Sequence, residues 1–318
     1  MSPPIVELDH PPAKPLSPDA PSRPPVNRPM LGAVLMTVAA LLLAALSGLA
    51  KYAAENGMDP LQIAFLRSLF ATIAMMPMLA PSILKHGIGW MKPERPWLMA
   101  FRGLSSAVGV CIFMIAVAKL PLAEMTAITF TAPLFATVGS ALILRETVRL
   151  RRWSAVLIGF VGVLVIVRPG HVPLSEGMIW AVAATLFMAM AVLVIKLLTR
   201  TDSSERIVFW TNIGLTIGTL VPAIVVWVPM RLEFWLIGIG LGLLGAVGHV
   251  FLTRAFSAAD ASLVMPFDYA RLPFAALIGY FAFGHLSDAY TWIGAAVIAG
   301  SAIYVARREQ QLAKQAES

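Results

Sequence analysis

DASLVMPFDYARLPFAALIGYFAF, residues 260–283, is long and apolar enough to cross a lipid bilayer, yet it carries Asp268 and Arg271 near its middle. A charged side chain at that depth costs about 3 kcal/mol or more unless it is paired or hydrated, so it commonly marks a functional site. The two residues are three positions apart, which places them on one helical face within reach of each other. Pro266 and Pro273 flank them, and prolines in membrane helices mark places where the backbone opens. The stretch predicts an interrupted membrane helix that presents an ion pair to a cavity.

The composition of the whole chain is typical of a membrane protein. Of the 318 residues, 58% are hydrophobic and 13% are charged, whereas soluble domains are about 25% charged. The single cysteine, Cys111, excludes an internal disulfide and a multi-cysteine metal site, and no cofactor is expected. The net charge of +7 would suggest a nucleic-acid partner in a soluble protein. Here the basic residues flank apolar segments, so the predicted partner is the lipid bilayer and not nucleic acid.

Ten apolar segments follow a Pro-rich N-terminal tail, residues 1–29, which we expect to be disordered. Each segment approaches the length that a membrane-spanning helix needs, and the connections between them are short. The predicted spans are residues 30–50, 61–80, 97–118, 122–144, 153–168, 177–198, 207–228, 234–254, 261–283 and 289–306. Outside these spans, the basic residues on one side are only Lys51, Lys119, Arg168 and Arg231, and all the others lie on the opposite side. This asymmetry predicts that both termini face the cytoplasm.

The two halves of the chain share a pattern. Each has an acidic residue at the start of its fourth span (Glu124, Asp260) and a proline within it (Pro133, Pro273). A repeat of five spans contains an odd number of crossings, so the two copies must have opposite orientations, as in transporters whose site lies between inverted repeats. We therefore predict an all-α integral membrane protein of ten transmembrane helices in two inverted five-helix repeats. The repeats comprise residues 30–168 and 177–306, and a cytoplasmic tail, residues 307–318, follows them.

Several segments carry a family likeness. PLAEMTAITFTAPLFATVGSALILRETVRLRRW (121–153), its counterpart in the second half, and AFLRSLFATIAMMP (64–77) resemble the EamA family of the drug/metabolite transporter superfamily. FDYARLPFAALIGYFAFG (267–284) and GSAIYVARRE (300–309) resemble the branch that includes riboflavin and S-adenosylmethionine uptake carriers. The resemblance implies a central cavity lined by helices one to four and six to nine, peripheral fifth and tenth helices, and movement by alternating access.

The sequence departs from the family at one position. His285 stands in a polar turn where relatives usually carry a glutamate. If that glutamate is structural in the relatives, its loss is tolerable. If it couples transport to an ion, the coupling of this protein differs from theirs.

The charged residues within the spans are candidates for the site. Asp268 and Arg271 could bind a charged or zwitterionic substrate or relay a proton, and the alternative is a structural salt bridge. Arg67 could meet an anionic group in the cavity, or it could be a buried partner of a backbone carbonyl or of Glu124. Arg102 lies near the cytoplasmic end of its span, so we expect it to snorkel toward that end. Glu124 could act as a gate or proton acceptor, or complement the dipole of its helix.

Other side chains could assist these. His249 could couple transport to protons, although a lone histidine is more often a packing residue. Stacking and hydrogen bonding to an aromatic substrate could come from Phe130, Trp210, Asn212, Tyr269 and Tyr280. For each of these five, ordinary core packing or an interfacial position is the alternative.

These patterns predict a secondary active transporter that moves a small organic metabolite, zwitterionic or aromatic, across the cytoplasmic membrane. The alternatives are an integral-membrane enzyme and a channel. The chain contains no HExxH, GxSxG or paired acidic motif for catalysis, no filter-like loop, and no Walker motif for ATP. The identity of the substrate, the direction of transport, the coupling ion, the oligomeric state and the role of the Pro-rich tail are left open by the sequence.

Overall fold

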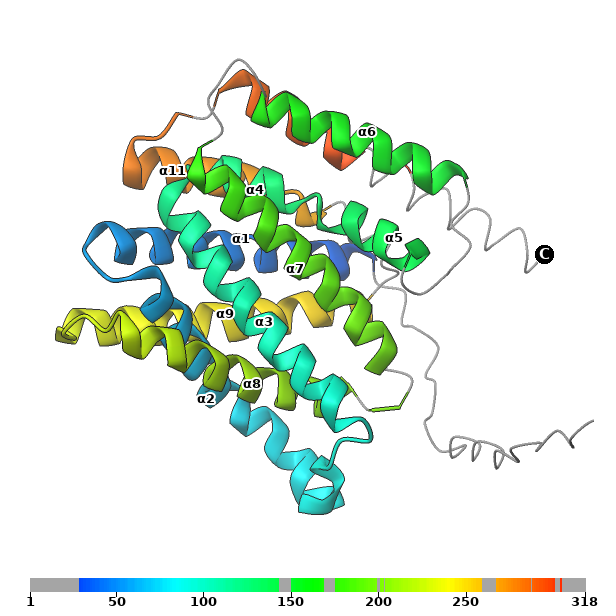
Figure 1. Ribbon diagram of the computed structural model, residues 1–318, viewed down its shortest axis with the longest axis vertical. Helices are drawn as coiled ribbons and strands as arrows, with labels where there is room; N and C mark the ends of the chain where they lie inside the picture. Colours follow the sequence, from blue (N-terminus) through cyan, green and yellow to red (C-terminus); the bar gives the residue numbers. More distant parts are fainter. Residues whose placement is uncertain are drawn as a thin grey trace, which may run out of the picture.

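The computed structural model describes residues 29–142, 150–168, 175–198, 201–202, 204–258, 267–286, 288–300 and 304, and all regular structure in these ranges is helical (Figure 1). The predicted tails at 1–29, apart from Pro29, and at 307–318 lie outside the described residues, as does Pro266. The helices are α1 (Pro29–Glu55), α2 (Pro60–His86), η1 (Ile88–Met91), α3 (Pro96–Lys119), α4 (Leu122–Thr129), α5 (Ala132–Leu142), α6 (Leu150–Val167), α7 (Glu176–Leu198), α8 (Ser204–Val225), α9 (Leu232–Ala258) and α11 (Arg271–Phe283), followed by a helix at Ala289–Gly300.

Six of these helices, α1, α2, α3, α7, α8 and α9, contain a stretch that is long and apolar enough to cross a membrane. Their outward surfaces are apolar as well. Exposed large hydrophobic side chains include Leu104, Val108, Ile179, Leu186, Ile217, Val221 and Ile224. A surface of this kind is unusual on a soluble monomer and suits contact with lipid tails. The remaining apolar helices are shorter, so the count of ten spans stays a prediction.

Two of the predicted spans are interrupted. The segment predicted at 122–144 divides into α4 and α5, with Phe130 and Thr131 between them. In the segment predicted at 261–283, Phe267 and Asp268 are helical, the next two residues form a turn, and α11 begins at Arg271. Each interruption lies just before a mid-segment proline, so both halves of the chain contain a broken helix at a corresponding place.

Helices from the two halves pack against each other in matched combinations. α3 lies along α7 and α1 lies along α9, while α3 packs on α8 and α2 packs on α9 (Figure 1). α2 also packs on α8. When the helices of each half are numbered from one, each of these contacts has a counterpart in which the two halves are exchanged. The third helix of either half contacts the first and second helices of the other half. The main core cluster lies between these helices and includes Ala44, Ile63, Met114, Ile128, Ala181, Leu241 and Leu272.

Glycines make two of these corresponding contacts close. A Cβ added to Gly214 of α8 would lie 2.6 Å from the Cα of Gly103 on α3. A Cβ added to Gly242 of α9 would lie 2.6 Å from the carbonyl carbon of Phe70 on α2. Small residues of this kind let helix backbones approach each other in membranes, where van der Waals packing drives association.

α2 and α8 meet through polar groups at one level. The hydroxyls of Thr72 and Thr216 lie 2.9 Å apart, and the Thr72 hydroxyl also lies 3.3 Å from the carbonyl of Asn212. Thr72 and Thr216 occupy the same position in their helices, counted from Pro60 and Ser204. The contact therefore joins corresponding points of the two halves.

α6 and the helix at Ala289–Gly300 lie side by side at the edge of the bundle (Figure 1). A Cβ added to Gly294 would lie 2.5 Å from the carbonyl oxygen of Gly162, so the two backbones are in contact. At the end of α6, the guanidinium of Arg168 forms an ion pair with Asp288 and lies 4.5 Å from the ring centroid of Tyr290. These contacts hold the two helices together.

The Arg168–Asp288 pair predicts an acid-sensitive contribution to stability. Burial raises the pKa of Asp288, but the hydrogen bonds from Thr291 and the Arg168 guanidinium lower it by more. The pKa therefore lies below its ordinary value of 3.8. A carboxylate with a lowered folded-state pKa stabilises above its unfolded-state pKa, and this contribution is lost as pH falls through the folded-state value. We expect Asp288→Asn to lower the thermal unfolding temperature by about 1–2 °C at pH 7, and the difference from the parent protein to vanish as the pH falls through the lowered pKa of Asp288. A difference that is independent of pH would contradict this account.

Candidate functional site

The two helix breaks touch. Phe130 lies in the break between α4 and α5, and Tyr269 lies in the break before α11. Their ring centroids are 4.9 Å apart with an interplanar angle of 75°, an edge-to-face arrangement that aromatic pairs favour. Phe130 is buried, whereas Tyr269 is half-buried. Residues that are far apart in the sequence therefore bring the interrupted segments of the two halves together.

The sequence explains why the backbone opens at these two places. Pro133 and Pro273 lack an N–H, so the helix ladder loses a hydrogen bond just before each of them. In the first break the hydroxyls of Thr129 and Thr131 donate to carbonyls of the preceding turn at 2.7 Å each. In the second break the carbonyl of Tyr269 accepts a hydrogen bond at 3.1 Å from the backbone of α11. Such local bonds are what make a broken helix tolerable at membrane depth.

The ion pair that the spacing of Asp268 and Arg271 predicts is formed at the second break. An Oδ2 of Asp268 accepts a hydrogen bond from Arg271 at 2.7 Å. The guanidinium carbon of Arg271 also lies 5.4 Å from the ring centroid of Phe130, which is within the range of a cation–π contact. The Oδ1 of Asp268 and the Nε of Arg271 are buried and have no hydrogen-bond partner. The pair is thus held by one strong contact and retains unused polar capacity.

Arg67 of α2 lies next to α9, the helix that carries His249. The Nε of Arg67 would be 4.0 Å from a Cβ on Gly245 of α9, and His249 follows one turn later on the same face. His249 lies within electrostatic range of both Arg67 and Arg271. Its side chain is nevertheless exposed.

Arg67 has no partner within the described part of the chain. Its Nε is buried and forms no hydrogen bond, and no ion pair joins its guanidinium to another described residue. Pairing with Glu124 was one of the predicted alternatives for Arg67, and no ion pair joins these two described residues. Glu124 lies half-buried on α4 within electrostatic range of Arg168 and Asp288. It therefore belongs to the neighbourhood of the peripheral helices.

Arg102 contacts a hydroxyl of its own helix. Its guanidinium donates to the hydroxyl of Ser106, and that hydroxyl in turn lies 2.5 Å from the Arg102 carbonyl. Ser106 is one turn further from the start of α3, so the side chain points along the helix and away from its near end. The Nε of Arg102 keeps no partner, so this hydroxyl meets only part of its hydrogen-bonding capacity, and the snorkelling of Arg102 stays a prediction.

Asn212 and Tyr280 lie apart from the ion pair. The amide of Asn212 donates to the carbonyl of Val208 at 2.9 Å, next to the crossing of α2 and α8. Tyr280 is exposed on α11, with its ring 5.2 Å from that of Phe281. A role of these two residues in substrate binding stays a prediction that their local contacts do not favour.

His285 follows the end of α11. Gly284 adopts a left-handed conformation with φ 67°, which glycine tolerates at a helix C-terminus, and the N–H of His285 bonds back to Gly279 at 3.0 Å. The imidazole stacks on Phe283 at 5.9 Å. His285 therefore stands at the far end of α11 from Arg271, in a position that shapes the turn.

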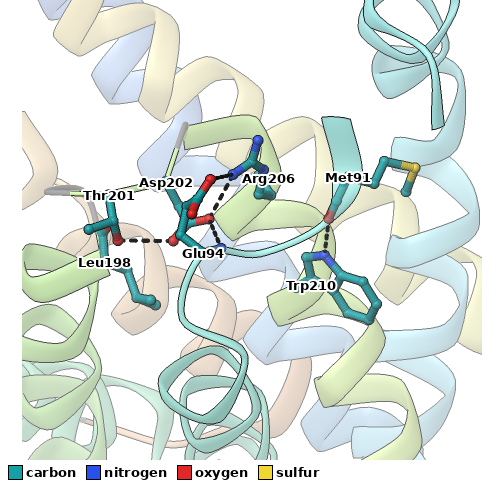
Figure 2. Close-up of polar contacts among 7 residues, drawn as sticks. All are labelled: Met91, Glu94, Leu198, Thr201, Asp202, Arg206 and Trp210. Atoms are coloured by element: carbon teal, nitrogen blue, oxygen red, sulfur yellow. Dashed lines mark hydrogen bonds and ion pairs between the residues drawn. The ribbon is translucent and has the colours of Figure 1, made fainter. Parts of the chain in front are cut away.

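A separate polar cluster joins the two halves where α3 begins (Figure 2). The carboxylate of Asp202, whose side chain is 0% exposed, lies 3.0 Å from Arg206 and accepts the backbone N–H of Glu94 at 3.1 Å. The indole of Trp210 donates to the carbonyl of Met91 at 2.7 Å. Trp210 thus anchors the segment before α3 and does not reach the ion pair. Sequence reasoning missed Asp202, although its spacing of four from Arg206 was a usable signal.

The buried carboxylate predicts a stabilising role for this cluster. We expect Asp202→Ala to lower the free energy of unfolding by about 2 kcal/mol, because the hydrogen bonds that reach a buried charged group are lost together. Glu94→Gln is the comparison variant, since Glu94 contributes its backbone N–H and its 67% exposed carboxylate lies 4.0 Å from Arg206, an exposed contact that contributes little. Thermal unfolding of the purified variants in detergent measures both. Equal losses of stability in the two variants would show that the buried carboxylate of Asp202 stabilises the fold no more than the exposed one of Glu94.

Comparison with known proteins gives a consistent result. The sequence profile described as the EamA-like transporter family matches twice, at residues 30–168 and 175–307. The riboflavin transporter of Vibrio cholerae is 31% identical over 297 residues, which cover 90% of this chain and 99% of the relative. The S-adenosylmethionine uptake transporter of Rickettsia prowazekii is 26% identical over 251 residues, which cover 79% of this chain and 84% of the relative.

A solved crystal structure shares the fold. It superposes with a TM-score of 0.57 at 18% sequence identity, and the alignment covers 90% of this chain and 99% of the other. At that identity the similarity concerns the arrangement of helices alone.

Proposed function

Because this chain belongs to the EamA-like transporter family, we propose that it is a secondary active transporter that moves a small organic metabolite across the inner membrane by alternating access. The resemblance drawn from the sequence is confirmed, and the chain is a multi-pass inner-membrane protein. Its relatives are named for the transport of riboflavin and of S-adenosylmethionine, which indicates a small-molecule substrate and argues against an enzyme.

The proposal includes two inverted repeats of five helices, residues 30–168 and 177–306, with both termini cytoplasmic. Its support is the pairing of contacts: α3 with α7 and α1 with α9, α3 with α8 and α2 with α9. The hydroxyl contact between Thr72 and Thr216 adds a contact between corresponding residues of the two halves. A twofold axis in the membrane plane that passes near this contact would relate the two sets.

The single observation that carries the proposal is the meeting of the two helix breaks around a charged pair. In transporters with internal repeats, interrupted helices supply the polar groups that bind substrate near the midplane. Here Phe130 and Tyr269 place the two breaks in contact, and the Asp268–Arg271 pair lies against them. A site built from both halves changes its access whenever one half moves relative to the other.

The ion pair suits a substrate that must bind and leave. A buried pair gains little net energy over its separated, hydrated ions. A substrate group that bonds to Arg271, while water or a second substrate group bonds to Asp268, therefore exchanges one set of charge-assisted hydrogen bonds for another of similar strength. The substrate then binds without becoming trapped, as repeated transport requires.

Counterflow in proteoliposomes tests the proposal. Vesicles are loaded with a mixture of unlabelled metabolites, including riboflavin and S-adenosylmethionine, and uptake of each labelled compound is followed. A carrier accumulates labelled substrate transiently by exchange, a channel shows no such acceleration, and an enzyme alters the compound chemically. Chemical conversion, or flux without exchange, would overturn the proposal in favour of one of the alternatives.

A further inference from the structure

We propose that Gln62 and Asp202 are positioning residues of the transport cycle, which hold the two faces of the helix bundle closed, and that their contacts open in turn. The inference rests on the proposed function, because it assigns residues to the alternating access described there. Its basis is a pair of contacts between the halves of the chain, which lie at opposite ends of the crossing of α2 and α8.

The first contact lies where α2 begins. The side-chain amide of Gln62 donates to the carbonyl of Val228 at 3.1 Å and accepts from the N–H of Val228 at 3.3 Å. It also lies 2.8 Å from the sulfur of Met230. Residues 227–230 contain no helix, so Gln62, which is 0% exposed, supplies the partners that Val228 lacks. We call this contact of Gln62 with Val228 and Met230 the outer tie, because α2 begins at the outer face in the proposed topology.

The second contact lies where α8 begins (Figure 2). The carboxylate of Asp202 accepts the backbone N–H of Glu94 at 3.1 Å. The indole of Trp210 donates to the carbonyl of Met91 at 2.7 Å. The chain that leads into α3 is thus docked on the start of α8. We call this contact of Asp202 and Trp210 with residues 91–94 the inner tie, because α8 begins at the cytoplasmic face in the proposed topology.

The two ties have corresponding places in the two halves. The outer tie joins the start of α2 to the chain that follows α8, and the inner tie joins the start of α8 to the chain that follows α2. Both of these connecting segments contain a tryptophan followed closely by a proline, Trp90 with Pro93 and Trp227 with Pro229. In each segment the residue after the tryptophan supplies a carbonyl to the tie. The ties are therefore a further pair of contacts with the halves exchanged.

A rocking motion of the halves opens such contacts at one face at a time. When two halves tilt about a central point, the contacts between them separate at one face while those at the other face persist. Thr72 and Thr216 meet on the same two helices between the ties. Each tie consists of a few hydrogen bonds, whose small net contribution allows them to break and form again during a cycle. Both ties are engaged in the structure, which therefore corresponds to a form closed at both faces.

Cysteine labelling from outside tests the outer tie. Ser68 lies on α2 between Gln62 and Thr72, and it is buried. In a Cys111→Ser background, Ser68→Cys is treated with a membrane-impermeant maleimide added to intact cells. We expect Gln62→Ala to raise the rate of labelling roughly tenfold, because loss of the tie favours the form that is open to the outside. An unchanged rate in Gln62→Ala would overturn the inference.

A control variant and a milder variant accompany this measurement. Tyr52→Phe removes an exposed hydrogen bond to Glu233 between α1 and α9, and we expect it to leave the rate of labelling unchanged. An equal rise in Tyr52→Phe would show that Gln62 has no special role and would overturn the inference. Met230→Ala removes a half-buried side chain that contacts Gln62. We expect a smaller rise in the same direction, which decides the question even if Gln62→Ala fails to insert.

Labelling at the opposite face separates a coupled closure from local loosening. Asn212 precedes Thr216 by four residues, as Ser68 precedes Thr72, so Asn212→Cys reports the cytoplasmic face in inverted membrane vesicles. We expect Asp202→Ala to raise its labelling and Gln62→Ala to lower it, because opening of one face keeps the other closed. Gln62→Ala that raises labelling at both faces alike would show that the ties are permanent struts and would overturn the inference.

These measurements need no substrate, so their failure and that of the proposed function can be told apart. If labelling at the two faces changes in opposite directions while counterflow fails, the ties are supported and the error lies in the proposed function. If counterflow succeeds while the variants change labelling at both faces alike, the protein is a carrier and the roles assigned to Gln62 and Asp202 are wrong.

Discussion

Arg271→Gln is expected to reduce the rate of substrate counterflow at least about 100-fold, equivalent to about 2.7 kcal/mol, while the protein still inserts into the membrane. The guanidinium of Arg271 contacts both Asp268 and the ring of Phe130, so the change removes the group that joins the charged pair to the contact between the helix breaks. Asp268→Asn is expected to have a comparable effect, because it leaves Arg271 without its partner. Counterflow in proteoliposomes with matched amounts of protein measures both.

A double variant separates transport from folding. Each single change leaves one half-buried charge unpaired, and the loss is below the roughly 3–5 kcal/mol of a fully buried pair. Asp268→Asn combined with Arg271→Gln removes both charges, so we expect thermal stability to recover toward that of the parent protein. Transport should stay low in the double variant, since the binding groups are absent. Recovery of transport together with stability would show that the pair is a structural salt bridge and no part of the site.

Gly242→Ala is expected to lower the free energy of unfolding by about 3 kcal/mol, the upper part of the range for overpacking. A Cβ at this position would lie 2.3 Å from the Cβ of Phe70 and 2.7 Å from the backbone nitrogen of Ala71. One contact is with a Cβ and the other with a backbone atom, so rotation of a side chain cannot relieve either of them. α2 and α9 must therefore separate.

Gly300→Ala is the matched control for this variant. Gly300 lies in the helix at Ala289–Gly300 and has no atom within 4 Å of an added Cβ. We expect this change to leave the unfolding temperature unaltered or slightly higher, because alanine is the better helix former. Similar behaviour of Gly242→Ala and Gly300→Ala would mean that α2 and α9 do not depend on close backbone contact.

Much of the fold follows from sequence alone because its causes are local. Apolar length sets the spanning helices, and the prolines at 133 and 273 mark where two of them open. The repeated pattern of the halves relates the two breaks to each other. That the breaks touch is a different kind of fact, since Phe130 and Tyr269 come together only when α4 packs on α11. Sequence spacing contains no information about that contact.

The candidate site divides in the same way. The Asp268–Arg271 pair was predictable because two residues three apart on a helix share a face. The direction of Arg102 was not predictable from its depth, because a hydroxyl one turn away competes with solvent for the guanidinium. Trp210 was a reasonable candidate for stacking until the carbonyl of Met91 proved to be its partner. Partners from distant segments decide such cases.

The hydroxyl contact between Thr72 and Thr216 has a mechanical consequence. If a twofold axis relates the two repeats, and each repeat adopts the other's conformation during transport, a point on that axis stays in place. The crossing of α2 and α8 would then act as a fulcrum that moves least while the helix ends sweep through the largest arcs. A weak, reversible hydrogen bond between two hydroxyls suits this position, because it keeps α2 and α8 aligned and offers little resistance when the helices tilt.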